Sequence, residues 1–400
     1  MKKRFSKFLS MEHHRHVAGI MICALALVLT VNPDGPAGEK GTANNGAAPS
    51  RGVPVFNGTR IPTILITNKG TLLAFCSPND NHPGNFCLRR SEDNGRTWGK
   101  LIRISPDGRK LRTKFGEPGV VVDRRTGTIW AFFNRGTAKH RSPKTAMHFT
   151  YSEDDGRTWK KPVSACNDPD RFGKDNEFTP VIAWQAKGIQ LSSGRLLVPC
   201  MRIDRKARDT ACLYSDDAGK TWRVSKRVPG KVGQEVCIVE LTDGTVYMNG
   251  RRASGRSGPV VRWVSRSKDG GLSWSPPRGE KQLTGAPCHA GVIRLSDARR
   301  HDRNRLLFSL PEGTPQRRQN LRIWLSYDEG KTWKKEDSRM LIKGSAAYSD
   351  MVLLPDMSVG ILYETNKPKW HSIFFTRFTL EWLTGGRDRI DRDKFKKKAG

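Results

Sequence analysis

Hydrophobic residues in this chain gather in short runs that suit β-strands. Between residues 53 and 383, Gly, Asp and Asn separate runs rich in β-branched and aromatic residues, among them TILIT, GTIWAFF, RLLVPCM, TVYMNG, RLLFSL and VGILYE. Runs of this kind, bounded by turn-forming residues, are typical of strands. The pattern predicts one all-β domain over the whole region.

Five copies of a short polar motif punctuate these strands. They are SEDNGRTW, SEDDGRTW, SDDAGKTW, SKDGGLSW and SYDEGKTW, which begin at Ser91, Ser152, Ser215, Ser267 and Ser326. A period of roughly 50 to 65 residues suits a four-stranded propeller blade. In each copy the Asp is expected to accept backbone N–H bonds across a tight turn, and the Gly two places on to take a positive φ. The Trp is expected to lock the hairpin onto its blade.

This pattern, Ser-x-Asp-x-Gly-x-Thr-Trp, resembles the Asp-box repeat of the sialidase superfamily, whose members are six-bladed propellers. Five boxes plus one blade without a box fit the region. The resemblance therefore implies an all-β fold, a six-bladed β-propeller with Asp-box repeats. Asp-boxes also occur in non-catalytic propellers, so the motif indicates a fold more strongly than an activity.

The ends of the chain differ in composition from the strand-rich region. Basic residues near the start and the apolar run 17–31 predict a signal peptide over 1–31, and hence export to the periplasm or the medium. An uncleaved N-terminal membrane anchor is the alternative, because no small-x-small cleavage site follows the run. A flexible linker is expected over 32–52, the propeller over 53–385, and a solvated basic tail over 386–400.

The charge balance favours anionic partners. The chain carries 71 Lys and Arg against 39 Asp and Glu, a formal net charge of +32. Its basic residues are spread along the sequence without a nucleic-acid recognition module, so nucleic acid is not an expected partner. The histidines form no metal-like set, and neither a metal nor an organic cofactor is expected. Cys76 and Cys87 flank a loop, where a disulfide in an oxidising compartment and buried free thiols are both reasonable.

The family resemblance extends to a set of arginines. Sialic acid carries a carboxylate on its anomeric carbon, and a guanidinium fork binds a carboxylate bidentately. Arg60, in TRIP, resembles the arginine of the family's Arg-Ile-Pro motif. Arg251, in MNGRR, and Arg318, in QRRQNLRIW, stand at positions that resemble the second and third arginines, with Arg317 as the alternative to Arg318. The resemblance implies that the three bind the substrate carboxylate.

The resemblance also implies a nucleophile and its base. Tyr348, in AAYSDMVLL, matches the family's Tyr-Ser-Asp strand, and sialidases use a tyrosine nucleophile. A neutral phenol avoids the repulsion that a carboxylate would meet at this anomeric carbon, but it needs a base. Glu235, in GQEVCIVEL, matches the family glutamate, although Gln234 replaces the usual Asn. Glu240 is the competing carboxylate, and its odd separation predicts that it faces the other way.

Two further carboxylates complete the implied site. Glu364, in LYET, lies where the family has a residue that orients the first arginine, and would act behind Arg60. Asp80, in the loop CSPNDNHPGNFCLRR, stands where the family has its acid/base, since shielding by a closing loop would raise its pKa enough to protonate a leaving oxygen. The Glu-x-Arg that follows Ala-Phe in many relatives is replaced here by Cys76-Ser77-Pro78, a departure that bears on which substrate is bound.

These residues together predict an exo-α-sialidase that hydrolyses terminal sialic acids of glycoconjugates with retention. Once the predicted signal peptide is cleaved, stable insertion into a membrane is not expected. One alternative is a hydrolase or transferase for a related nonulosonic or ulosonic acid. The other is a non-catalytic Asp-box propeller that binds anionic glycans.

Overall fold

The protein is described here from a computed structural model. The described residues are 48–50, 52–78, 84–136, 146–173, 181–183, 186–203, 208–230, 232–251, 260–314, 316–366 and 371–391. All of them belong to one compact unit, residues 45–400.

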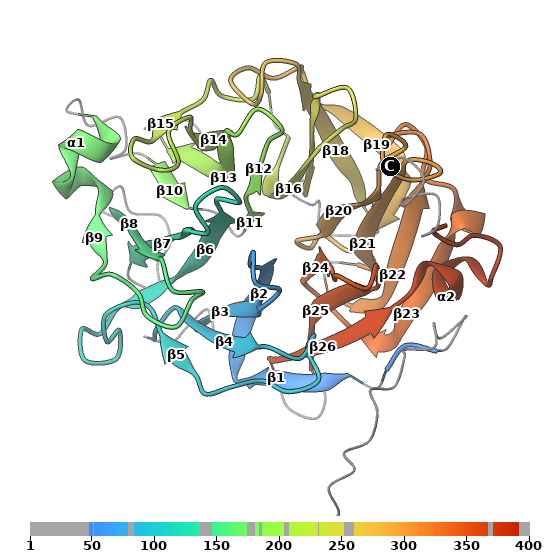
Figure 1. Ribbon diagram of the computed structural model, residues 1–400, viewed down its shortest axis with the longest axis horizontal. Helices are drawn as coiled ribbons and strands as arrows, with labels where there is room; N and C mark the ends of the chain where they lie inside the picture. The colour runs from blue at the N-terminus through green and yellow to red at the C-terminus, as the bar shows by residue number, and fades with distance from the viewer. Residues whose placement is uncertain are drawn as a thin grey trace, which may run out of the picture. The chain divides into compact units, whose positions relative to one another are not determined.

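The described strands form six sheets that follow one another around a central axis (Figure 1). The first contains β2 (Thr59–Ile66), β3 (Leu72–Pro78), β4 (Cys87–Ser91) and β5 (Ile102–Arg103). The second contains β11 (Ala186–Lys187), β6 (Lys114–Val122), β7 (Ile129–Gly136), β8 (Ala146–Ser152) and β9 (Val163–Ser164). The third contains β10 (Val181–Ala183), β12 (Ile189–Gln190), β13 (Leu196–Ile203), β14 (Arg208–Ser215) and β15 (Arg223–Val224).

The second half of the chain forms the other three sheets. The fourth contains β16 (Gln234–Glu240), β17 (Val246–Arg251), β18 (Val260–Ser267) and β19 (Arg278–Gly285). The fifth contains β20 (Gly291–Ser296), β21 (Arg305–Gly313), β22 (Arg318–Ser326) and β23 (Ser338–Ser345). The sixth contains β24 (Ser349–Leu353), β25 (Val359–Thr365), β26 (Ser372–Phe378) and the first strand of the chain, β1 (Val53–Asn57). The predicted six-bladed propeller is confirmed.

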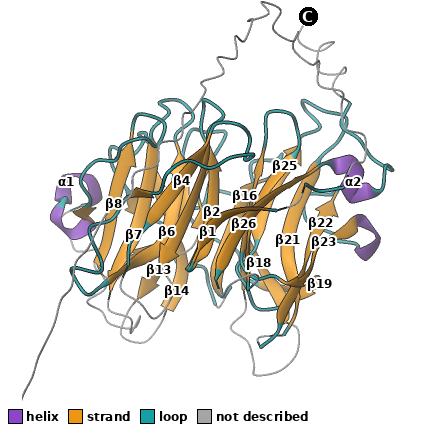
Figure 2. Ribbon diagram, turned by 90° about the horizontal axis from the view of Figure 1, so that it is seen from below, coloured by secondary structure: helices purple, strands orange, loops and turns teal. Residues whose placement is uncertain are grey.

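The sixth blade closes the ring. β1 pairs antiparallel with β26, with Val53 opposite Phe375 and Asn57 opposite Ser372. Because one blade contains strands from both ends of the chain, opening the ring would break a complete ladder of backbone hydrogen bonds. In Figure 2, seen across the ring, the strands run between two faces.

Each Asp-box begins at the end of one outer strand of its blade and leads into the outermost one: β4 to β5, β8 to β9, β14 to β15, β18 to β19 and β22 to β23. In the first box the Ser91 hydroxyl donates to Asp93 at 2.7 Å and accepts from the Gly95 amide at 2.8 Å. Asp93 also accepts from the amide and the hydroxyl of Thr97, at 3.0 and 2.6 Å. The same bonds recur in the other four boxes. Burial alone would raise the pKa of Asp93, but these hydrogen bonds lower it to about 2.

Each box also joins its own blade to the blade before it. Gly95 and Gly219 have the predicted positive φ, 85° and 87°. An added Cβ would lie 2.0 Å from the Phe375 ring in the first case and 2.3 Å from the Trp130 ring in the second. The box tryptophan reaches further than predicted, since Trp222 packs on Trp130 of the preceding blade with ring centroids 5.7 Å apart. The motif therefore sets the spacing between blades as well as closing a hairpin.

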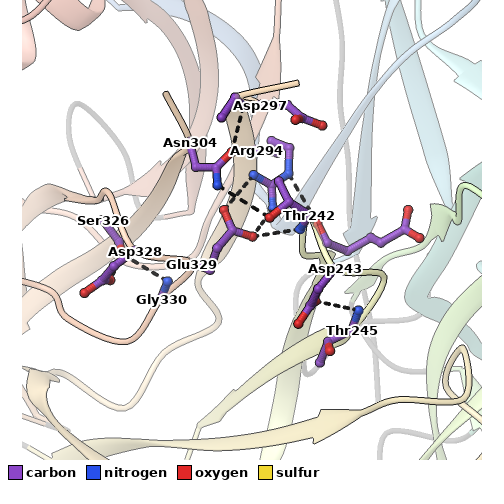
Figure 3. A network of polar contacts seen from close by, with 12 residues as sticks. Thr242, Asp243, Thr245, Arg294, Asp297, Asn304, Ser326, Asp328, Glu329 and Gly330 are labelled. Carbon is purple, nitrogen blue, oxygen red and sulfur yellow. Dashed lines mark hydrogen bonds and ion pairs between the residues drawn. The ribbon is translucent and has the colours of Figure 1, made fainter. Parts of the chain in front are cut away.

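A polar network fixes the fourth blade to the fifth at the turns (Figure 3). Glu329, in the fifth box, accepts from Arg294 at 2.6 Å and from the Thr242 amide at 2.9 Å. Arg294 also donates to the Glu240 carbonyl at 3.0 Å. Asn304 Nδ2 donates to the Thr242 hydroxyl at 3.5 Å. Charged groups thus take part in the contact between adjacent blades.

The folded region extends beyond the boundaries predicted from sequence at both ends. Thr376 in β26 donates to the Ser50 carbonyl at 2.6 Å, inside the predicted linker. Asp388, inside the predicted solvated tail, is 9% exposed and accepts from Arg305 and Tyr327 at 2.7 and 2.8 Å. The first part of the tail is therefore packed, because its carboxylate neutralises a buried arginine.

The helices in the described part of the chain are short, α1 (Pro169–Phe172) and α2 (Leu380–Thr384). None is long and apolar enough to cross a membrane. The predicted signal peptide lies outside the described residues. Cys76 and Cys87 face each other in β3 and β4 as buried free thiols, which is one of the two states considered for them.

Candidate active site

The candidate site lies where the inner strands of several blades begin. β2, β6 and β16 each carry an irregularity there, and a residue in it has a positive φ: 67° at Ile61, 61° at Glu117 and 54° at Glu235. Such conformations are unfavourable for residues other than Gly and cluster at functional sites. A bulge re-aims side chains that strict alternation would send to opposite faces.

Glu364, in β25, binds the start of β2 through both carboxylate oxygens. Oε1 accepts from the Ile61 amide at 2.6 Å, and Oε2 accepts from Arg60 at 3.3 Å. Glu364 is 4% exposed. One buried carboxylate therefore holds both the strained residue and the arginine beside it.

Tyr348 is hydrogen-bonded to Glu235 and Arg251, which lie on another blade. The Tyr348 phenol donates a hydrogen bond to Glu235 Oε1. Arg251 Nη1 donates to the same oxygen at 2.6 Å and to the Tyr348 phenol at 3.2 Å. Gln234, next to Glu235, pairs in register with Arg251, so neighbouring strands place the base and the arginine together. A phenol that donates to a carboxylate is in position to lose its proton to it.

Positive charge surrounds the Tyr348 ring. The guanidinium carbons of Arg60 and Arg318 lie 5.1 and 5.3 Å from the ring centroid. Burial raises the pKa of Tyr348 well above its ordinary value, the charge of Glu235 adds to this rise, and Arg251, Arg318 and Arg60 oppose it. The phenol is therefore protonated at rest, and its proton must go to a base before it can attack.

The structure brings together six of the seven residues predicted for the site: Arg60, Glu235, Arg251, Arg318, Tyr348 and Glu364. Asp80 lies outside the described residues, so its place remains a prediction. Arg317, the alternative to Arg318, has an exposed side chain. Glu240 stays out of the site as predicted, since it accepts from the amide and hydroxyl of Ser192 at 2.8 and 2.7 Å.

Sequence reasoning missed a second layer behind the site. Asp350 is 2% exposed, accepts from the Ile64 amide at 3.0 Å and forms an ion pair with Lys187 at 2.8 Å. It is the Asp of the Tyr-Ser-Asp motif, in which the sequence predicted a role for Tyr348 alone. The Lys187 side chain also donates to the Met351 carbonyl. Together they join β11, β24 and β2 beneath Tyr348.

Glu117 is a further carboxylate at this end of the blades. It is 9% exposed, and Asn134 donates to its Oε2 at 2.9 Å. Its amide donates to Ser77 Oγ at 2.9 Å, and Ser77 pairs in register with Arg60. The turn-like Gly-Glu-Pro-Gly sequence around it was the available signal. Within the described residues, no three His, Cys, Asp or Glu side chains gather as a metal site would require.

Comparison with known proteins agrees with this geometry. The BNR repeat-like domain family matches residues 87–362. A sialidase from Micromonospora viridifaciens is 34% identical over 356 residues, which cover 82% of this chain and 53% of that protein. A sialidase from Bacteroides fragilis is 29% identical over 335 residues, covering 77% and 60%. An exo-alpha-sialidase from Aspergillus fumigatus is 28% identical over 382 residues, covering 83% and 86%.

A solved structure agrees as well. The Hadza microbial sialidase Hz136 superposes with a TM-score of 0.70 at 25% identity, over 82% of this chain and 66% of that one. The matched region of this chain corresponds to 53% of the length of the Micromonospora sialidase and 60% of the length of the Bacteroides sialidase. Five Asp-boxes, the ring of six blades and the family match together show that this chain belongs to the sialidase family of BNR-repeat proteins.

Proposed function

We propose that this protein is an exo-α-sialidase, which removes terminal sialic acids from glycoconjugates with retention of configuration. The observation that carries the proposal is the hydrogen bond that Tyr348 donates to Glu235, with Arg60, Arg251 and Arg318 around the phenol. The sialidases of Micromonospora and Bacteroides and the exo-alpha-sialidase of Aspergillus support it by similarity.

The arginines account for recognition of the substrate carboxylate. Arg60 is oriented by Glu364 before substrate arrives. Arg318 has no acidic partner among the described residues, and its Nε is a buried donor without a hydrogen-bond acceptor there. An incoming carboxylate would supply that acceptor and neutralise the charge. Buried donors left unpaired are costly, so this arrangement favours anionic sugars over neutral ones.

The Tyr348–Glu235 pair accounts for the chemical step. Glu235 accepts the phenol proton as the Tyr348 oxygen forms a bond to the anomeric carbon, and the bond to the aglycone oxygen breaks. We propose Asp80 as the acid that protonates this oxygen. In the second step Asp80 takes a proton from water, water attacks the anomeric carbon, and the tyrosine oxygen leaves and regains its proton. Two inversions give net retention.

The experiment is hydrolysis of a fluorogenic α-sialoside by the purified protein beside Tyr348→Phe and Asp80→Ala variants. We expect the Tyr348→Phe variant to lose at least about a thousandfold in kcat, since the nucleophile is absent. NMR of the first product should show the α anomer. Initial release of the β anomer would refute retention, and a wild-type protein that binds sialic acid without turnover would show a glycan-binding propeller instead.

The substrate in the Asp80→Ala test can separate its role from that of Tyr348. A sialoside with a good leaving group needs little protonation, whereas a natural glycoside needs it fully. Activity of this variant should therefore fall much more on sialyllactose than on the fluorogenic substrate. An equal fall on both would remove Asp80 from the acid role. Export, predicted from residues 1–31, remains part of the proposal and is tested by fractionating cells that express the full chain.

A further inference from the structure

A concavity of about 800 Å³ lies at the junction of the first and second blades, and none of the residues predicted for the candidate site lines it. Its lining comes from the turn 111–113, which joins the two blades, from β7 and β8, and from residues 161–164, which lead into β9. Phe133 in β7 packs on Phe86 of the first blade with ring centroids 5.4 Å apart. Arg135 and His148 share the face of Phe133, because Arg135 follows it by two residues and His148 stands opposite it in register. Both therefore lie on the side of the second blade that meets the first.

The charge of this concavity is positive. Arg112, Arg135 and Lys161 line it, all three are exposed, and none of them forms an ion pair with another described residue. The described residues of the lining include no Asp or Glu. Asp168, one residue beyond the lining, is already paired with Arg171 at 3.4 Å. Cations gathered without counterions attract anions and raise their local concentration.

Apolar and neutral polar groups lie among these cations. Leu111 and Val163 are large hydrophobic side chains that are 49% and 36% exposed. The His148 ring is held in place by stacking on Phe133, with centroids 5.8 Å apart and an angle of 20° between the planes. Ser164 adds a hydroxyl to the same lining. An acidic sugar presents an acid group, hydroxyls and an apolar ring face, and the lining offers a partner for each.

The backbone fixes the turn that carries Arg112. Arg112 has a φ of 49°, a conformation that is unfavourable for residues other than Gly and that clusters at functional sites. The Thr113 amide donates to the Gly108 carbonyl at 2.8 Å, and the Thr113 hydroxyl donates to the Gly136 carbonyl of β7 at 2.8 Å. The turn is thus tied to the strand that carries Arg135. A lining fixed in advance loses less conformational entropy when a ligand binds.

β7 connects the concavity with the end of the blades where the candidate site lies. From this strand Asn134 donates to Glu117 at 2.9 Å and to the Ala183 carbonyl of the third blade at 2.7 Å. Arg135 is the next residue, and successive side chains of a strand point to opposite faces. Neighbouring residues of one strand therefore contact the candidate-site end on one side and line the concavity on the other. A glycan that extends from the candidate site across the end of the second blade would pass over both.

We propose that this concavity is a second binding site, which takes an internal acidic sugar of a polyanionic glycan whose terminal sialic acid occupies the candidate site. The cations Arg112, Arg135 and Lys161 bind the acid group, and Leu111 and Val163 contact the sugar ring. A concave lining suits a discrete sugar better than the surface of a membrane. The inference rests on the proposed function, which supplies the site for the terminal sugar, but binding in the concavity does not require turnover.

The test compares two substrates of the full chain. Oligosialic acid carries an acid group on every sugar, whereas sialyllactose carries one on its terminal sugar alone. For Arg112→Gln/Arg135→Gln, KM for oligosialic acid should rise by about tenfold, since two lost charge-assisted contacts amount to about a decade or more in affinity. KM for sialyllactose, and kcat for both substrates, should change by less than about twofold, because neither side chain belongs to the candidate site.

The matched control is Arg300→Gln/Lys331→Gln, which removes the same net charge elsewhere. Both residues are exposed and lie in the turns that follow β20 and β22, away from the start of the inner strands. This variant should keep the wild-type KM for both substrates, and both double variants should melt as the wild type does, since all four side chains are exposed. An equal rise in KM for oligosialic acid in the two variants would show attraction by net charge alone and would overturn the inference.

Calorimetry measures binding without turnover, with oligosialic acid and the Tyr348→Phe variant. The affinity should fall by about tenfold when Arg112→Gln/Arg135→Gln is added, and an unchanged affinity would overturn the second site. An oligoglutamate peptide with the same number of charges should bind more weakly, because it has no sugar ring or hydroxyls. Equal binding of the peptide, weakened by the same substitutions, would make the concavity a general site for acidic polymers and overturn its assignment to a glycan.

The outcomes separate this inference from the proposed function. Absence of turnover by the wild-type protein would end the proposed function, and calorimetry would still show whether the concavity binds an acidic glycan. Wild-type turnover with an unchanged KM for oligosialic acid in Arg112→Gln/Arg135→Gln would overturn the second site alone.

Discussion

Removing one partner of the ion pair between Lys187 and Asp350 should be among the more destabilising single changes to the propeller. It joins β11 to β24 at 2.8 Å, and the same carboxylate accepts from the Ile64 amide in β2. The side chain of Asp350 is 3% exposed and that of Lys187 is 16% exposed. We expect Lys187→Met to leave a buried carboxylate with amide donors but no counterion.

The magnitude follows from this geometry. Two unit charges at this separation attract by about 6 kcal/mol at an effective dielectric of about 20, and desolvation of both groups cancels much of it. Removing one partner of a buried pair typically costs about 3–5 kcal/mol. Because Lys187 keeps some contact with water, the lower end applies, and Lys187→Met should cost about 3 kcal/mol. Asp350→Asn should cost less, since the ammonium it leaves behind is the more exposed partner.

The assay is a double-mutant cycle in urea, with the unfolding midpoint and slope measured for both single variants and for Lys187→Met/Asp350→Asn. The double variant should be more stable than the sum of the single losses predicts, by about 2 kcal/mol, because the uncompensated charge is gone. A loss below about 1 kcal/mol in Lys187→Met, or losses that simply add, would refute the reasoning. Lys187→Arg, which keeps the charge, is the matched control.

Three further predictions follow from the site and the boxes. Glu364→Gln should raise KM by about tenfold with a smaller change in kcat, because Arg60 loses a charged partner. Initial rates over a range of sialoside concentrations measure both constants, and an unchanged KM would contradict the prediction. Gly219→Ala should cost about 3 kcal/mol or more through its clash with Trp130, whereas Gly194→Ala, with φ 91° in open space, should cost only about 1–2 kcal/mol; equal losses in thermal melts would remove the clash from the explanation. Burial alone would raise the pKa of the box carboxyls Asp93, Asp154 and Asp269, but their hydrogen bonds lower it to about 2. The stability that they contribute should therefore be complete above about pH 4 and be lost as the pH falls toward 2. The urea midpoint of unfolding should fall over that range, and it should fall less steeply when these residues are changed to Asn.

The fold could be predicted from the sequence because its main signal is local. An Asp-box forms its hydrogen bonds within eight residues, so the motif has the same geometry wherever it occurs. The boundaries of the domain were harder to predict from the sequence. Asp388 looks like one charge in a basic tail, and only its long-range contact with Arg305 shows that it is packed. Contacts over such sequence separations leave no periodic pattern in the chain.

The candidate site shows the same division. Tyr348, Glu235 and the three arginines could be predicted because they stand in short motifs that resemble those of a family. Without those motifs, the three arginines could not be told apart from the other basic residues of the chain, which has 71 Lys and Arg. In the sequence, Arg305 and Lys187 cannot be distinguished from surface cations. Their burial is decided by how neighbouring strands pair, which the sequence pattern did not specify residue by residue. Asp80 remains a prediction.

The backbone strain at the start of the inner strands was also outside the reach of sequence patterns, and it explains why Glu364 does more than orient Arg60. A β-branched residue at φ 67°, as at Ile61, costs about 1–2 kcal/mol relative to an extended conformation. The 2.6 Å bond from the Ile61 amide to Glu364 offsets that cost, and the other oxygen of the same carboxylate binds Arg60. Since one group holds both, loss of its charge should let the bulge relax and the guanidinium move together. Arg60 therefore depends on a distant strand, β25, for the geometry that its own strand would not adopt.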